Sequence, residues 1–126
     1  MPILCLDFST MQAYHICMRV WDIPPKKLCR NHLLGEHREL HAIWVVITKN
    51  KKGYSKHPET LRWKGKLRSL YARHEKLVEE MQKRGYNHKS TLSSKLATGI
   101  KKQSNYVDSI QSQINILKRK RCGCRV

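Results

Sequence analysis

Residues of the kind that face a protein core recur at helical spacing in three stretches of the chain, and polar segments separate these stretches. The first covers residues 26–48 and follows Pro24-Pro25, a pair that is tolerated in the first turn of a helix. The second covers residues 59–84 and stops before Gly85, a residue type that commonly ends helices. The third is shorter and covers residues 107–117. The positions that form the three stripes are Leu33, Leu40, Ile43, Trp44 and Ile47; Leu67, Leu70, Tyr71, His74, Leu77, Val78 and Met81; and Val107, Ile110, Ile114 and Leu117.

The segments between these predicted helices contain no convincing pair of strands joined by a two-residue turn. They are rich in Lys, Ser and Asn instead, as in the basic run Lys49-Asn50-Lys51-Lys52. A chain of 126 residues has the size of one domain. We therefore predict an all-α fold, a single compact domain of about three main helices with long basic loops.

Positive charge dominates the composition. Lys plus Arg number 26 against 9 for Asp plus Glu, which gives a formal net charge of +17. This imbalance favours a polyanionic partner, and nucleic acid comes first because basic side chains displace the counterions of phosphates. The basic residues lie on every predicted helix and loop rather than along one amphipathic face, so a membrane surface is the least favoured partner. No apolar stretch approaches the roughly 20 residues that a membrane span needs.

Residues 1–17 differ in composition from the rest of the chain. They contain no Lys or Arg and a single acid, Asp7, so all the positive charge lies in residues 18–126. A secretory signal begins with basic residues, and none is present here. We place a boundary between Cys17 and Met18, with an extension of residues 1–17 before a helical domain of residues 18–126. Two explanations stay open: the extension is a weakly structured addition, or translation starts at Met18.

The five cysteines do not indicate a disulfide framework, because an odd number cannot all be paired. Reduced thiols in a cytoplasm are the simpler interpretation. Cys122 and Cys124 form a CxC pair, but a metal site needs two further ligands, and no second CxxC or HxxxH motif supplies them. We therefore expect no metal site and no cofactor.

The segment 31–41 contains the side chains that are the best candidates for a functional site. On a helix His32, Glu36 and Glu39 fall on one face, because they are spaced four and then three residues apart. Two carboxylates and an imidazole on a partly apolar face are costly to bury, so they indicate either ion pairs or a functional site. On the pattern alone, a solvent-exposed face is the favoured interpretation.

Two blocks of the sequence resemble the phage endonuclease V family, the pyrimidine-dimer DNA glycosylase/AP lyases. The first block is Met18-Arg19-Val20 followed by Asn31-His32-Leu33-Leu34-Gly35-Glu36-His37-Arg38-Glu39-Leu40. The second block runs from Lys66-Leu67 to the turn Lys83-Arg84-Gly85-Tyr86-Asn87. The likeness covers residues 18–92. The chain is also similar to short microbial relatives that begin Met-Arg-(Leu/Val/Ile)-Trp.

The resemblance implies a DNA repair mechanism that uses no cofactor. In that mechanism the α-amine of the first residue attacks the sugar of the damaged nucleotide, expels the base and forms an imine, and β-elimination then breaks the strand. The register of the motif assigns this amine to Met18 and the acid/base glutamate to Glu39. An arginine that the family carries one turn after this glutamate is Ala42 here. The resemblance assigns DNA contacts to Arg19, Asn31, His32 and Arg38.

The resemblance further implies a cytoplasmic, nucleoid-associated monomer that acts on double-stranded DNA with a pyrimidine dimer or an abasic site. Where the chain starts decides whether it is active. A chain that retains residues 1–17 has an amide at Met18, and the delocalised lone pair of an amide is not nucleophilic. The alternative is a non-catalytic basic protein on the same scaffold that binds DNA or RNA, with its amine blocked by residues 1–17.

Overall fold

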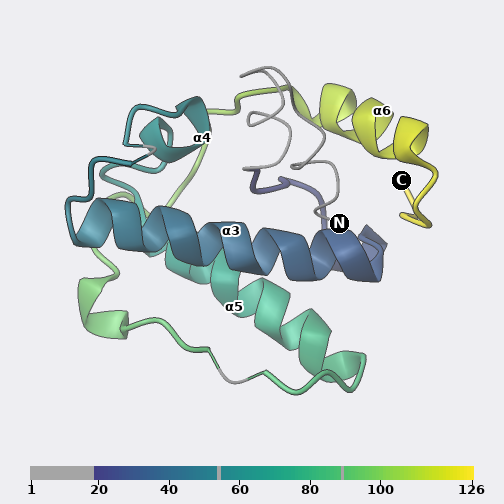
Figure 1. Cartoon of the computed structure of the whole chain (residues 1–126), viewed down its shortest axis with the longest axis horizontal. Helices are drawn as coiled ribbons and strands as arrows, with labels where there is room; N and C mark the ends of the chain where they lie inside the picture. Colours follow the sequence, from purple (N-terminus) through teal and green to yellow (C-terminus); the bar gives the residue numbers. More distant parts are fainter. Residues whose placement is uncertain (1–18, 54, 89) are drawn as a thin grey trace.

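Four α-helices and two short 3₁₀ turns form the part of the chain that the structure describes, residues 19–53, 55–88 and 90–126. The structure, a computed structural model, contains no strand in these residues, so the predicted all-α class is confirmed. None of the described helices combines the length and the apolar character that crossing a bilayer requires. In chain order (Figure 1) they are η1 (Pro25–Lys27), α3 (Arg30–Thr48), α4 (Pro58–Leu61), α5 (Leu67–Lys83), η2 (Ser94–Leu96) and α6 (Ile110–Lys120).

Helices α3 and α5 pack against each other and form the centre of the molecule (Figure 1). Their apolar stripes face inward, as the spacing predicts, because residues three and four apart share one side of a helix. Each fully buried Leu contributes roughly 1.5–3 kcal/mol through the area it removes from water. The buried members of the two stripes are Leu33, Leu40, Ile43 and Trp44 on α3, and Leu70, His74, Leu77, Val78 and Met81 on α5.

The first long helix begins at Arg30, four residues later than the pattern predicts. Pro24 and Pro25 start the short 3₁₀ turn η1 instead, and Leu28 then leaves helical geometry with φ −82° and ψ 141°. This extended residue buries the Leu28 side chain in the core. Leu28 is therefore part of the core but not of the helix, and α3 starts after it.

The predicted helix over residues 59–84 is wrong in one respect, because the structure divides it into α4 and α5. Gly65 adopts a φ of +75°, which favours glycine and cannot continue a right-handed helix. The break allows Arg62 and Trp63 to turn inward, and both are buried. The apolar spacing carries no sign of this break.

Helix α6 is confirmed as an element, and the predicted stripe holds at Ile114 and Leu117, which pack in or against the core, but not at its N-terminal end. The helix begins at Ile110 with a cap in which the Ser109 hydroxyl accepts a hydrogen bond from the Ser112 amide at 3.1 Å. Val107 and Ile110 of the predicted stripe are exposed, whereas Gln113 and Leu117 are buried. A buried amide side chain, together with Leu117, thus sets how α6 faces the rest of the protein.

Candidate active site

The segment 19–23, the first described part of the chain, is held along the face of α3 that carries Glu36 and Glu39. Figure 1 shows this segment beside the first half and middle of α3. The Trp21 amide donates a hydrogen bond to the Glu36 carboxylate, and the Val20 amide donates one to Glu59 Oε1 at 3.0 Å. The side chains of Val20 and Trp21 are buried. The chain is therefore fixed in place immediately after residue 18.

Glu36 is a structural carboxylate. It is 1% exposed and accepts two hydrogen bonds from Arg73 on α5, from Nε at 2.6 Å and from Nη2 at 2.9 Å. Burial raises the pKa of Glu36, and the Arg73 guanidinium opposes that shift. The interpretation that Glu36 lies in solvent is therefore wrong: a partner 37 residues away in sequence neutralises it, and helical spacing on α3 alone does not reveal that partner.

Glu39 lies one helical turn beyond Glu36 on the same side of α3. Its carboxylate is half-buried and has no hydrogen-bond or ion-pair partner among the described residues. Burial raises the pKa of Glu39, and the neighbouring Arg38 lowers it in part. The two carboxylates thus differ, because Glu36 is paired inside the helix pair and Glu39 is half-buried with no partner in the described part of the chain.

The structure separates the predicted DNA-binding residues into two groups. Asn31 and Arg38 are exposed on α3 and available to a ligand. Arg19 is 7% exposed, with Nη1 at 2.6 Å from Asp108 Oδ2, and its DNA contact stays a prediction. His32 is half-buried among cysteines. The predicted nucleophile, Met18, lies outside the described residues.

Glu59 is a buried acid that the sequence analysis did not single out. It is 3% exposed and, besides the Val20 amide, it accepts hydrogen bonds from Arg62 Nε and, at 3.2 Å, from Trp63 Nε1. Burial raises its pKa, and Arg62 opposes that shift. Arg62 also donates to the Val20 carbonyl at 2.9 Å. Glu59, Arg62 and Trp63 are three and four residues apart, but the contacts of Glu59 and Arg62 with Val20 span about forty residues, so the apolar pattern gave no signal for them.

Three cysteines and one histidine converge at the start of α3. Cys29 and His32 come from the first turn of α3, and Cys122 and Cys124 come from the tail after α6. Their ligand atoms all lie within 4.8 Å of one another, so this set can hold a metal ion. Burial lowers the pKa of His32 to about 4, which keeps its imidazole neutral at neutral pH. The sequence search for ligands to complete the CxC pair overlooked Cys29-x-x-His32, which lies about ninety residues away in the chain.

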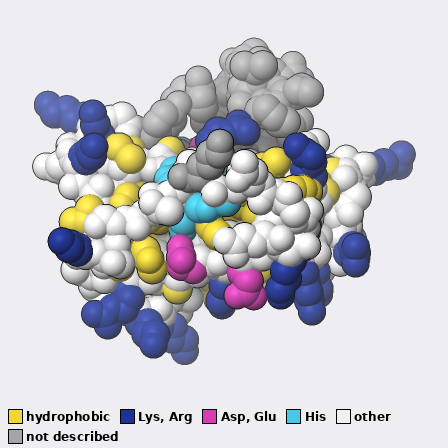
Figure 2. All heavy atoms as spheres, turned by 90° about the horizontal axis from the view of Figure 1, so that it is seen from below, with side chains coloured by type: hydrophobic (Ala, Val, Ile, Leu, Met, Phe, Trp, Pro, Cys, Tyr) yellow, Lys and Arg dark blue, Asp and Glu magenta, His cyan; other side chains and the backbone are white. Residues whose placement is uncertain are grey.

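Four histidines converge on the other side of α3, against α5. His37 and His41 lie on α3, His74 on α5 and His88 in the loop that follows, with ligand atoms all within 4.8 Å of one another. Burial, with the neighbouring imidazoles, lowers the pKa of His37 to about 4. Figure 2 shows histidines gathered near the middle of one face, with Lys and Arg projecting around its edge. This set can also hold a metal ion.

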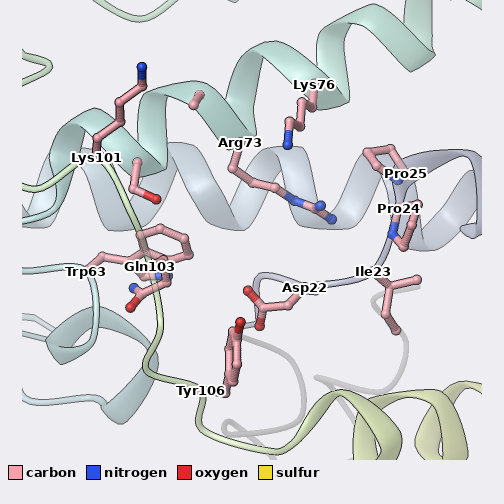
Figure 3. A pocket seen from close by; sticks show the side chains of 12 residues that line it. Asp22, Ile23, Pro24, Pro25, Trp63, Arg73, Lys76, Lys101, Gln103 and Tyr106 are labelled. Atoms are coloured by element: carbon pink, nitrogen blue, oxygen red, sulfur yellow. The ribbon is translucent and has the colours of Figure 1, made fainter.

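A hollow of about 510 Å³ lies between α5, the segment 22–25 and the segment 101–106. Figure 3 shows Arg73 and Lys76 reaching from α5 toward it, across from Asp22 and Tyr106. Glu39 and Arg38 do not line it. This hollow is therefore lined by three basic side chains, Arg73, Lys76 and Lys101, but it does not contain the carboxylate that the sequence nominates for catalysis.

Comparison with known proteins gives one match. The sequence profile of the family described as pyrimidine dimer DNA glycosylase matches residues 18–94. This span includes the segment 19–23, α3, α4 and α5, with Glu36 and Glu39, and ends before α6 and the Cys122-Cys124 tail. No curated protein and no solved structure matches the chain.

Proposed function

Because the chain belongs to the pyrimidine dimer DNA glycosylase family, we propose that it removes a damaged pyrimidine from double-stranded DNA and cuts the strand at the resulting abasic site. The nucleophile is the backbone amine of residue 18 in a polypeptide that begins there. An α-amine has a pKa of about 7.7–8.0, so part of it is neutral and nucleophilic at neutral pH, unlike a lysine near 10.4.

The proposed reaction proceeds through an imine. The amine attacks C1′ of the damaged nucleotide, the bond from C1′ to the base breaks, and the base leaves with the electron pair. The nitrogen then loses a proton, and its lone pair forms a double bond to C1′ as the C1′–O4′ bond of the sugar ring breaks and O4′ takes up a proton, which gives the protonated imine. Removal of a proton from C2′ then expels the 3′ phosphate by β-elimination. Glu39 is the group that accepts and returns protons at the sugar, which is the work of a general acid/base.

The observation that carries this proposal is the placement of the segment 19–23 along the face of α3 that bears two carboxylates. Trp21 is bonded to Glu36, and Glu39 lies one turn further with no partner among the described residues. Glu36 is 1% exposed and both of its oxygens accept hydrogen bonds from Arg73, so a substrate does not reach it. The pairing of Glu36 with Arg73 therefore leaves Glu39 as the acid of this face that can exchange protons with a substrate.

Asn31 and Arg38 supply the proposed DNA contacts on α3, because both side chains are exposed on the helix that carries Glu39. The net charge of +17 supports binding to phosphates, and this binding should weaken steeply as salt rises. To reach the sugar of a stacked nucleotide, the protein must open the duplex locally, and a damaged or missing base lowers that cost.

Borohydride reduction of the imine tests the proposal. We compare polypeptides of residues 18–126 and 1–126 on a duplex with one abasic site. We expect the shorter polypeptide to form a covalent adduct with the DNA and to cut it, and the longer one to do neither until residues 1–17 are removed. Glu39→Gln in the shorter polypeptide should lower the cutting rate about 10²- to 10⁴-fold.

Glu79→Gln is the matched control, since Glu79 is an exposed carboxylate on α5 whose partner is Lys83. It should cut DNA at the unaltered rate. Duplex binding by the Glu39→Gln protein should also persist. If the polypeptide of residues 18–126 binds the duplex but yields no adduct, the proposal is refuted in favour of the non-catalytic nucleic-acid binder.

A further inference from the structure

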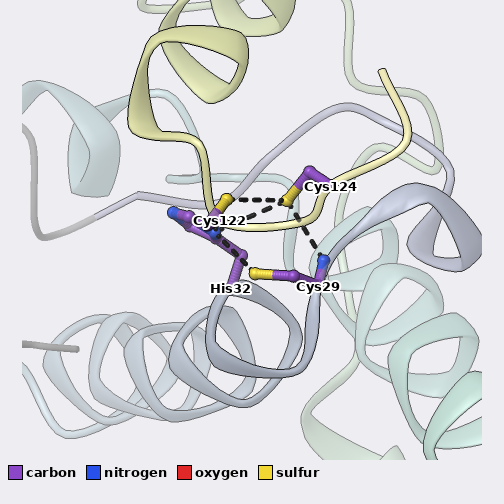
Figure 4. Close-up of side chains that lie close together, drawn as sticks. All are labelled: Cys29, His32, Cys122 and Cys124. Atoms are coloured by element: carbon purple, nitrogen blue, oxygen red, sulfur yellow. Dashed lines mark hydrogen bonds between the residues drawn. The ribbon is translucent and has the colours of Figure 1, made fainter.

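The cluster of Cys29, His32, Cys122 and Cys124 joins two distant parts of the chain (Figure 4). His32 Nδ1 lies 3.1 Å from the sulfur of Cys29, 3.2 Å from that of Cys122 and 3.5 Å from that of Cys124. The sulfurs of Cys122 and Cys124 are 3.4 Å apart. One imidazole nitrogen therefore points at three thiols at once.

These distances are close to those between neighbouring ligand atoms around a tetrahedral metal ion. Zinc binds sulfur at about 2.3 Å and imidazole nitrogen at about 2.0–2.1 Å, which places neighbouring ligand atoms roughly 3.5–3.8 Å apart. Three of the observed separations, at 3.1, 3.2 and 3.4 Å, are shorter than this, and the separation of His32 from Cys124 is 3.5 Å. A small outward movement of the side chains makes room for an ion at the centre.

The surrounding backbone favours thiolate ligands at this place. The Cys29 amide donates a hydrogen bond to Cys124 Sγ at 3.1 Å, the kind of outer contact that orients a metal ligand. Gly123 has a φ of +97°, a conformation that favours glycine and turns the chain between the two cysteines of the CxC pair. All three cysteines are free thiols, and a disulfide would need its sulfurs about 2.05 Å apart.

We propose that Cys29, His32, Cys122 and Cys124 bind one Zn²⁺ ion in a tetrahedral site. Three thiolates and one imidazole fill all four positions, which is typical of a structural zinc site rather than a catalytic one. The ion fastens the tail after α6 to the first turn of α3. It also gives the Nδ1 atom of His32 a task different from the DNA contact expected from the family motif.

The test is metal analysis of the full chain purified without added chelator. We expect the Cys122→Ser/Cys124→Ser protein to hold one equivalent of zinc less than the wild type. Cys5→Ser/Cys17→Ser is the matched control, because it removes the same number of cysteines but none of the four proposed ligands, and it should keep the wild-type zinc content. Equal zinc in the wild type and the Cys122→Ser/Cys124→Ser protein overturns the proposal.

A second measurement keeps the test valid if the double variant folds poorly. Wild-type protein is stripped of metal and titrated with Co²⁺. Thiolate ligands give a sulfur-to-cobalt charge-transfer band in the near ultraviolet, and adding Zn²⁺ should abolish it. Zinc should also raise the Tm of the stripped protein, because metal bound to the folded state stabilises it. Absence of the band overturns the proposed site.

The four-histidine cluster carries a second inference independently of the cysteines. His41 Nε2 lies 3.1 Å from His74 Nε2, and His88 Nε2 lies 3.1 Å from His37 Nε2. His74 Nδ1 is 2.7 Å from the carboxylate of Glu75, and a carboxylate behind a histidine is a recurrent outer contact of metal ligands. The geometry points to a divalent transition-metal ion bound by the four Nε2 atoms, since imidazole suits zinc, copper and nickel.

The Cys122→Ser/Cys124→Ser protein isolates this histidine site for its own test. Titration with Co²⁺ should give visible ligand-field bands without the thiolate charge-transfer band. His88→Gln should remove these bands with the least damage to the core, because His88 lies in a loop. His15→Gln removes a histidine that is not one of the four proposed ligands and should leave the bands unchanged. If no bands appear and zinc analysis of this protein finds none bound, the histidines are two hydrogen-bonded pairs and the inference fails.

Discussion

The helix pair α3–α5 and the C-terminal segment 95–126 are held in the protein by different forces. The helix pair buries two apolar stripes against each other. The C-terminal segment places Leu117 in the core and packs Ala97, Ile114, Ile116 and Val126 partly against it, and it adds long-range polar attachments. These attachments are Asp108 with Arg19, Gln113 with Asp22, Asn105 with Arg62, Gln103 with Lys66, and the cysteine cluster.

The difference matters for how each region loosens. Apolar contacts across α3 and α5 are shared by many residues, so the pair should open only when the whole protein unfolds. Directional bonds at a few points can break together without disturbing the rest, which makes the C-terminal segment a candidate for local unfolding. Substitutions in the two regions should therefore differ in how much they lower the free energy of unfolding. They should also differ in which backbone amides exchange hydrogen faster.

The largest loss of stability is expected at the buried ion pair between Glu36 of α3 and Arg73 of α5. Arg73→Met keeps the length of the side chain but leaves Glu36 buried without a partner. Breaking a buried pair costs about 3–5 kcal/mol, and we expect urea unfolding to show a loss of that order. All α3 and α5 amides should lose hydrogen-exchange protection together.

The double variant Glu36→Met/Arg73→Met is the control for that loss. Replacing both charges by apolar side chains removes the unpaired group, so most of the stability should return. A single variant that loses less than about 1 kcal/mol would show that Glu36 is neutral or hydrated in the folded protein.

An intermediate effect is expected at Gln113. Its amide accepts a hydrogen bond from the Asp22 amide at 2.8 Å and donates one to Asp22 Oδ2 at 3.0 Å. Gln113→Ala leaves these buried groups unsatisfied, at a cost of about 1–3 kcal/mol. Faster hydrogen exchange should be confined to α6 and the residues beside Asp22. Uniform acceleration across α5 as well would remove the distinction between the two regions.

The smallest effect is expected at Ile110, which is 42% exposed. Ile110→Ser should change the free energy of unfolding by less than about 0.5 kcal/mol, as is usual for surface positions. The apolar spacing predicts the opposite, because it assigns Ile110 to the buried stripe of this helix. Thermal unfolding of the variant decides between the two, and a loss similar to that of Gln113→Ala would restore the predicted face.

The sequence predicts the helix pair well because periodicity is a local signal. Leu33, Leu40, Leu70 and Leu77 can each be assigned to the core from their spacing alone, and all four are buried. The orientation of α6 depends instead on the bonds between Gln113 and Asp22, which lie 91 residues apart. Spacing along one helix contains no information about such a partner.

The same limit applies to the candidate sites. Helical spacing places Glu36 and Glu39 on one face, but only the approach of Arg73 from α5 distinguishes the paired carboxylate from the unpaired one. The ligands Cys29 and His32 meet Cys122 and Cys124 only because the tail folds back onto η1, where the Arg125 amide donates to the Lys27 carbonyl at 2.7 Å. Short motifs read one at a time therefore miss a site whose halves lie at opposite ends of the domain.

That fold-back has a practical side for anyone producing the protein. Since Cys124 and Arg125 are built into the contact with the start of α3, residues appended after Val126 emerge beside His32 rather than from a free end. A polyhistidine purification tag there would place additional imidazoles next to the thiols, where they would compete for the zinc ion proposed at this cluster. A tag that contains no metal-binding residues, or one that is cleaved off before assays, avoids this interference.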